Sequence, residues 1–183
     1  MPRRPPRKPP PTRPKNKPLD LPKRKHPRLK HHDYAAGCYF VTICTQDRRC
    51  ILSDICVGRG LGPAEVRLTP CGEIAEKQLI DLERRYPAVH IDKYVIMPDH
   101  VHAIVRLDEQ AAGASPRPTL VDVICAYKSL TSRLCRKLIP APKIFQTSFH
   151  DHVIRNETDY REVWAYIDGN PAAWQADKTQ DAQ

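Results

Sequence analysis

The sequence has no long apolar run and almost no acidic residues at its N-terminus. No segment approaches the length of a membrane-spanning helix, and the first residues lack the apolar core of a secretory signal peptide. Residues 1–30 contain one acid, Asp20, against 12 Lys and Arg, and hold 10 of the 19 prolines; the rest of the chain has 18 Lys and Arg against 20 acids. We therefore expect a disordered basic tail over residues 1–30, one folded domain over residues 31–176, and a C-terminal tail over residues 177–183.

The basic tail favours a polyanionic partner. Its excess of 11 positive charges is confined to one end of the chain, whereas the remaining residues carry a net charge of −2. A segment with this charge attracts nucleic acid. The alternative is a solubilising extension with no partner of its own.

The seven cysteines contain no Cys-x-x-Cys pair. Four of them recur every six residues, but structural zinc sites usually use pairs of ligands separated by two to four residues. With an odd number of cysteines and no export signal, we expect reduced thiols in a cytoplasmic protein.

Apolar periodicity predicts alternating strands and helices in the folded part. Strands are expected at residues 39–45, 89–96, 100–107 and 145–154. Helices are expected after the caps Thr69 and Thr119, and from about residue 158 to Pro171. Residues 51–68 show an irregular pattern broken by glycines. The order β-α-β-β-α-β-α predicts a ferredoxin-like α+β fold, an antiparallel sheet with helices packed on it.

Two histidines separated by one apolar residue open the third predicted strand. With Val101 in the core, the two-residue period of a strand places His100 and His102 together on the opposite face. Paired imidazoles are half of a metal site. The alternative is two surface histidines on an edge strand.

A second pair, His150 and His152, surrounds Asp151. If these two histidines face outward together, the carboxylate faces the core, which is costly unless it is paired. The first histidine pair is therefore the better metal candidate.

Two residues of the last predicted helix can complete the His100–His102 site. Tyr166 and Asn170 lie four residues apart and share a face next to the apolar stripe, so burial of the helix does not require Tyr166. The amide oxygen of Asn170 suits a hard divalent cation alongside two imidazoles. Tyr166 is the candidate nucleophile.

Five segments occur in an order and at spacings that resemble a known family. They are residues 39–45 (YFVTICT), 95–102 (VIMPDHVH), 127–129 (YKS), 152–156 (HVIRN) and 166–171 (YIDGNP). Over about residues 34–174 the chain resembles the REP-associated tyrosine transposases, relatives of the single-strand HUH (Y1-type) transposases. The resemblance implies the HUH endonuclease fold.

The resemblance also implies a reaction and roles for four residues. The activity would be a metal-dependent single-stranded DNA endonuclease and strand transferase, acting at hairpin-forming repetitive palindromes through a 5′-phosphotyrosine. His100, His102 and Asn170 would hold Mg²⁺ or Mn²⁺, and Tyr166 would attack phosphorus.

The implied partner is single-stranded or hairpin DNA in the bacterial cytoplasm, at the nucleoid. We expect DNA contacts from the basic tail and from Arg48, Arg49, Lys128, His152 and Arg155. Both a monomer and a homodimer remain open.

Two other functions are compatible with the residues. A non-catalytic module could bind nucleic-acid hairpins with the same fold, although the intact set of His100, His102, Tyr166 and Asn170 argues against lost catalysis. A small zinc hydrolase would use the histidine pair and an acidic general base, for which Asp99 is the only neighbouring acid.

Overall fold

The computed structural model describes residues 34–56, 64–109 and 118–180, with side chains up to residue 174. The predicted basic tail lies outside these residues. A four-stranded antiparallel sheet has the strand order β4-β5-β1-β6, and a separate hairpin pairs β2 with β3. The strands are β1 Gly37–Cys44, β2 Ser53–Cys56, β3 Glu65–Leu68, β4 Val89–Ile96, β5 His100–Leu107 and β6 His150–Ile154. The helices are α1 Pro70–Arg85, α2 Leu120–Cys135 and α3 Glu157–Gln180.

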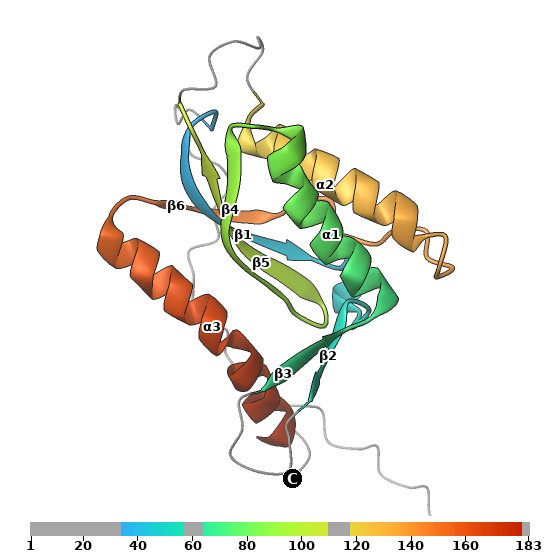
Figure 1. Ribbon diagram of the computed structural model, residues 1–183. Helices are drawn as coiled ribbons and strands as arrows, with labels where there is room; N and C mark the ends of the chain where they lie inside the picture. Colours follow the sequence, from blue (N-terminus) through green and yellow to red (C-terminus); the bar gives the residue numbers. More distant parts are fainter. Residues whose placement is uncertain (1–33, 57–63, 110–117, 181–183) are drawn as a thin grey trace, which may run out of the picture.

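The helices cover the two faces of the sheet unequally. Figure 1 shows α1 and α2 side by side on one face and α3 on the other. Alternate residues of β1 and β5, such as Val41 and Val101, join a large buried cluster with α1 and α2. The intervening residues face α3, where Ile104, Ile154 and Ile167 form a smaller cluster. This arrangement, a sheet between two helical layers (Figure 1), confirms the predicted α+β fold.

Both predicted helix starts are confirmed. The Thr69 side chain accepts a hydrogen bond from the Gly72 amide, directly before Pro70. Thr119 and Asp122 form a reciprocal capping box at the start of α2. Each cap satisfies backbone amides that have no partner within the helix. Leu138, which the apolar periodicity after Thr119 predicts as part of the buried stripe of this helix, instead lies beyond the end of α2 and is 54% exposed.

Three strand features differ from the sequence-based expectations. The irregular stretch over residues 51–68 contains the hairpin β2–β3, whose strands are four residues long and carry no clean alternation of buried positions. The fourth large-sheet strand begins at His150 rather than at residue 145, because Phe145 makes only an isolated bridge to Thr45. The first strand begins two residues earlier than predicted, at Gly37.

The last helix continues past its predicted end. α3 contains Pro171 and extends to Gln180, beyond the expected domain boundary at residue 176. Proline removes one backbone hydrogen bond but does not prevent helical angles at the following residues. Burial of Pro171 and the contact of Trp174 with His100 offset that loss. None of the helices in the described ranges combines the length and the apolarity that a membrane crossing requires.

Candidate active site

The histidine pair lies on an interior strand. β5 is hydrogen-bonded to both β4 and β1, so the edge-strand alternative does not hold. Val101 is fully buried in the α1–α2 cluster, and His100 and His102 face α3 with exposures of 5% and 4%. The period of the strand therefore places both imidazoles together on the face opposite the large core, as predicted.

Each imidazole is oriented by a neighbour at its Nδ1 atom. His100 Nδ1 lies 2.6 Å from Asp99 Oδ1, and His102 Nδ1 lies 2.9 Å from Thr42 Oγ1. Thr42 is the cross-strand partner of His102 in the β1–β5 register. The two Nε2 atoms point at each other across 2.9 Å. An Nδ1–H that donates to these partners leaves both Nε2 lone pairs converging on one point.

Burial keeps His102 neutral. Desolvation, together with the neighbouring His100 and the charge of Arg48, lowers the pKa of its imidazole to about 3. Metal binding requires the neutral imidazole. His102 therefore needs no deprotonation at physiological pH to act as a ligand.

A strained turn brings a guanidinium to the site. Asp47 and Arg48 both have positive φ values, 56° and 53°, which cost energy in residues other than glycine. The turn directs Arg48 Nε to Asp99 Oδ2 at 2.8 Å. Because Asp99 is 4% exposed and bonds both Arg48 and His100, its carboxylate is not the free general base that the zinc-hydrolase alternative requires.

His100 and His102 line a cavity of about 440 Å³, and residues of α3 form part of its wall. Its walls are formed by Thr42, Arg48, His100, His102, Tyr166, Asn170, Ala173 and Trp174. The Tyr166 ring lies edge-on to His102 and to Phe40, with centroid distances of 5.3 and 5.8 Å, yet it remains 53% exposed. The cavity therefore joins the predicted nucleophile, both imidazoles and Asn170, although they come from separate elements.

The donor set fits a divalent cation. Two neighbouring ligands of an octahedral ion, each about 2.1 Å from it, are about 3 Å apart, which matches the separation of the two Nε2 atoms. Within the described ranges, no three His, Cys, Asp or Glu side chains group as a metal site. The third predicted ligand is the amide of Asn170, and the carboxylate of Asp99 faces the Nδ1 atom of His100 instead.

The predicted DNA-contacting residues do not form a single group. Arg48 lines the cavity, whereas Lys128 lies on α2, where its Nζ donates to the Thr147 carbonyl. Arg49 donates to the Lys143 carbonyl at 2.9 Å. His152 lies on β6 and Arg155 directly follows that strand; the His152 ring and the Arg155 backbone amide both contact Asp159 of α3.

In the second histidine pair, the intervening Asp151 points to the opposite face of the sheet from His150 and His152. His150 and His152 lie opposite Thr42 and Phe40, on the α3 side of the sheet. Asp151 faces the other side, half-buried, and accepts a hydrogen bond from the Tyr34 hydroxyl at 3.3 Å. One oxygen of the Asp151 carboxylate is therefore paired, whereas Oδ1 is buried without a hydrogen-bond partner. His152 is engaged with Asp159.

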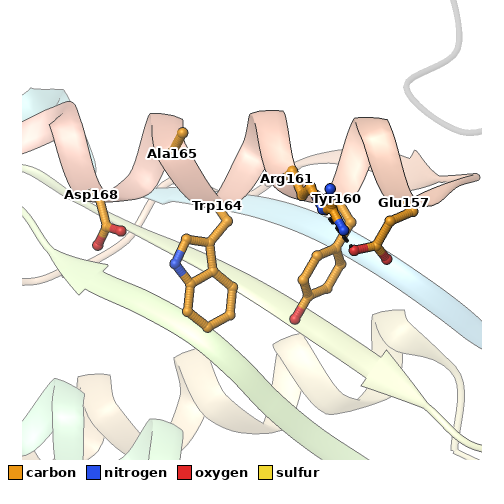
Figure 2. A pocket seen from close by; sticks show the side chains of 6 residues that line it. All are labelled: Glu157, Tyr160, Arg161, Trp164, Ala165 and Asp168. Carbon is orange, nitrogen blue, oxygen red and sulfur yellow. Dashed lines mark hydrogen bonds and ion pairs between the residues drawn. The ribbon is translucent and has the colours of Figure 1, made fainter.

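A second hollow of about 440 Å³ lies along α3, lined by Glu157, Tyr160, Arg161, Trp164, Ala165 and Asp168 (Figure 2). Its rings help to attach the helix to β4: Tyr160 donates to Asp92, and Lys93 lies over the Trp164 ring at 4.8 Å and pairs with Asp168. This hollow holds none of the predicted site residues. We therefore assign it a structural role.

Sequence reasoning missed three residues that line the cavity beside the histidines: Thr42, Ala173 and Trp174. The position of Thr42 beside His102 follows from the β1–β5 register, and no local sequence pattern specifies that register. Trp174 lies three residues past Pro171, where the sequence predicts no helix, and its ring lies 6.0 Å from that of His100.

Comparison with known proteins supports the fold. No protein-family profile matches the chain. An uncharacterised protein of Haemophilus influenzae is 28% identical over 171 residues, a match covering 85% of this chain and 92% of that protein. A solved structure of a REP-associated tyrosine transposase bound to a REP hairpin superposes with a TM-score of 0.57 at 23% identity, covering 80% of this chain and 73% of the other. The chain therefore has the fold of a REP-associated tyrosine transposase, as its sequence motifs predict.

Proposed function

We propose that this protein is a metal-dependent single-stranded DNA endonuclease and strand transferase that acts next to hairpins. One observation carries the proposal: two imidazole Nε2 atoms converge at 2.9 Å in a cavity that also contains Tyr166 and Asn170. A nucleophile beside a preorganised cation site is the arrangement that phosphoryl transfer requires. The transposase-like fold supports the same activity class.

Tyr166 is the nucleophile of the proposed reaction. Its oxygen, after loss of the phenolic proton, attacks the phosphorus of the scissile phosphodiester and forms a phosphotyrosine bond. The bond from phosphorus to the 3′ oxygen breaks, and that oxygen leaves as a 3′-hydroxyl after taking up a proton. The 5′ end stays on Tyr166, and the energy of the phosphodiester is kept in the new bond. A second 3′-hydroxyl reverses the step and joins a new strand.

His100, His102 and Asn170 would hold the cation, with Mg²⁺ or Mn²⁺ as the candidates. A divalent ion supplies charge that stabilises the transition state at the non-bridging phosphate oxygens. Asp99 and Thr42 orient the imidazoles, and Arg48 lies in the same cavity with 48% of its side chain exposed, where its charge attracts the phosphate.

The proposed substrate is DNA with a hairpin next to the cleaved strand, in the bacterial cytoplasm. The structurally similar transposase is bound to a REP hairpin. In this chain, Arg48, Arg49, Lys128, His152 and Arg155 are the proposed phosphate contacts, together with the basic tail over residues 1–30. Such contacts give salt-dependent affinity without sequence discrimination of their own.

The proposal is tested by trapping the covalent intermediate. Hairpin oligonucleotides with an unpaired flank are incubated with the protein and Mg²⁺ or Mn²⁺, and denaturing gels are used to detect a protein–DNA band. We expect a band that disappears with EDTA and in the double variant His100→Ala/His102→Ala. The control His90→Ala/His150→Ala removes two histidines outside the cavity and is expected to keep the band.

Hairpin binding without any adduct would replace the proposal with the non-catalytic binding module. An adduct that forms equally well in EDTA and in the His100→Ala/His102→Ala variant would contradict the metal site. A metal-dependent adduct lost only in that variant supports both the nuclease and its ligands.

The hydroxyl of Thr42 is expected to strengthen metal binding. Thr42→Val keeps the shape of the side chain and removes the oxygen beside His102 Nδ1, so we expect Mn²⁺ affinity to fall about 10- to 100-fold. Isothermal titration calorimetry with Mn²⁺ measures this change. Thr42→Ser, which keeps the hydroxyl, is the control and is expected to stay near the wild-type value; equal losses in both variants would assign the effect to packing.

A further inference from the structure

A long stretch of the chain has no acidic residue. Residues 123–150 contain five Lys and Arg and not one Asp or Glu: Lys128, Arg133, Arg136, Lys137 and Lys143. The stretch covers most of α2 and the segment that leads to β6. The part of the chain after residue 30 has a slightly negative net charge, so this local excess stands out.

The structure folds this stretch into a groove of about 280 Å³. Its lining residues are Lys128, Ser129, Ser132, Arg136, Pro142, Lys143, Ile144, Phe145, Gln146 and Thr147. The polar members carry ammonium, guanidinium, hydroxyl and amide groups, and no carboxylate lines the groove. Groups that donate hydrogen bonds and carry positive charge bind phosphate oxygens. The chemistry of the groove therefore suits an anion.

Three of these side chains form a row along α2. Lys128, Ser132 and Arg136 are spaced four residues apart, so they lie on one face of the helix, and the row extends for about 12 Å. Phosphates of one DNA strand follow each other every 3.4 Å or so along the duplex axis. The row is therefore long enough to follow about three successive phosphates. Lys143 faces the row from the opposite side of the groove.

Backbone contacts tie the groove to the catalytic cavity. Gln46 N donates to the Ile144 carbonyl at 2.7 Å, and Thr45 forms a bridge with Phe145. Arg49 donates to the Lys143 carbonyl, and its neighbour Arg48 lines the cavity. The segment that carries Arg48 and Arg49 therefore contacts both the cavity and the groove.

The groove and the cavity differ in aromatic surface. The only ring that lines the groove is that of Phe145, which is 3% exposed and packs against Tyr127. The cavity presents Tyr166 and Trp174. Unpaired bases stack on exposed rings, whereas paired bases leave only the backbone phosphates accessible to positive side chains. The cavity thus suits the unpaired strand and the groove suits a paired stem.

We propose that the groove between α2 and residues 142–147 binds the phosphate backbone of the double-stranded DNA stem next to the cleaved strand. This inference rests on the proposed function for the identity of the DNA. It adds a binding surface that includes Ser129, Ser132, Arg136 and Lys143, and it explains how a domain with no overall positive charge holds a hairpin.

The test compares two double variants with the same loss of charge. Arg136→Ala/Lys143→Ala changes the groove, and Arg84→Ala/Arg161→Ala removes two arginines that are 78% and 77% exposed on α1 and α3. Fluorescence anisotropy at increasing NaCl concentrations follows a DNA hairpin with an unpaired flank, an unpaired strand of equal length, and the RNA hairpin of the same sequence.

In the groove variant we expect DNA hairpin affinity to fall about tenfold and the slope of log K against log[salt] to decrease by about 1.8. The unpaired strand and the control variant should keep the wild-type values. Equal hairpin affinity in the two variants would overturn the inference, and so would an equal loss for the unpaired strand or a larger loss for RNA. A normal covalent adduct combined with unchanged hairpin binding would overturn the groove and leave the nuclease intact. If the wild-type protein forms no adduct but the groove variant still loses hairpin affinity, the nuclease proposal would be overturned and the groove inference would stand.

Discussion

Replacing Tyr166 with phenylalanine is expected to abolish the covalent protein–DNA adduct while leaving the fold intact. The change removes one oxygen from a side chain that is 53% exposed, and the phenyl ring keeps its edge-on contacts with His102 and Phe40. We expect the free energy of unfolding to change by no more than about 0.5 kcal/mol. Cleavage should fall by more than about 10⁴-fold, since loss of a covalent nucleophile leaves only binding and electrostatic assistance.

Tyr160→Phe is the matched control. Tyr160 lies on the same helix, but its hydroxyl donates to Asp92 at 3.3 Å, at a distance along α3 from the cavity. Denaturing gels of both variants at saturating hairpin DNA compare adduct yields, and thermal melting compares stabilities. If the adduct survives in Tyr166→Phe and disappears in Tyr160→Phe, the nucleophile has been assigned to the wrong tyrosine.

Gly72→Ala is expected to cause the largest loss of stability that a single methyl group can produce in this domain. A Cβ at Gly72 would lie 1.8 Å from the Leu52 carbonyl oxygen and 2.9 Å from its carbon. That oxygen accepts hydrogen bonds from both the amide and the hydroxyl of Thr69, the cap of α1. Relief of the clash requires a backbone shift that breaks the cap. We expect the free energy of unfolding to decrease by about 3 kcal/mol or more.

The same substitution at Gly169 should have the opposite effect. A Cβ there meets nothing within 4 Å, so alanine brings only its higher helix propensity, worth about 0.5–1 kcal/mol. Urea denaturation followed by circular dichroism measures both variants. A Gly72→Ala protein as stable as the wild type would show that Leu52 and α1 can separate without cost.

Local patterns predict the elements that position the histidines. Apolar patterns predict β4 and β5 at the residues where the structure has them, and Thr69 and Thr119 mark helix starts through cap chemistry that operates within four residues. The face shared by His100 and His102 follows from the strand period alone. These features depend only on neighbours along the chain.

The features that sequence reasoning missed depend on tertiary contacts. Thr42 reaches His102 because β1 and β5 pair in one register, and no local signal specifies that register. α3 passes Pro171 because burial and the Trp174–His100 contact outweigh one missing hydrogen bond. The basic groove is formed by α2 and residues 142–147 together. The sequence shows the charged residues of both segments, but it does not show that they line one surface.

The unequal covering of the sheet has a consequence for motion. Most of the buried apolar side chains lie with α1 and α2, whereas α3 is attached through the small cluster of Ile104, Ile154 and Ile167. Elements with little buried surface open at a lower free energy than the whole domain. We therefore expect α3 to open at a lower free energy than the rest of the domain. Under the proposed mechanism, such an opening would move a DNA end linked to Tyr166 from one 3′-hydroxyl towards another without unfolding the rest of the domain.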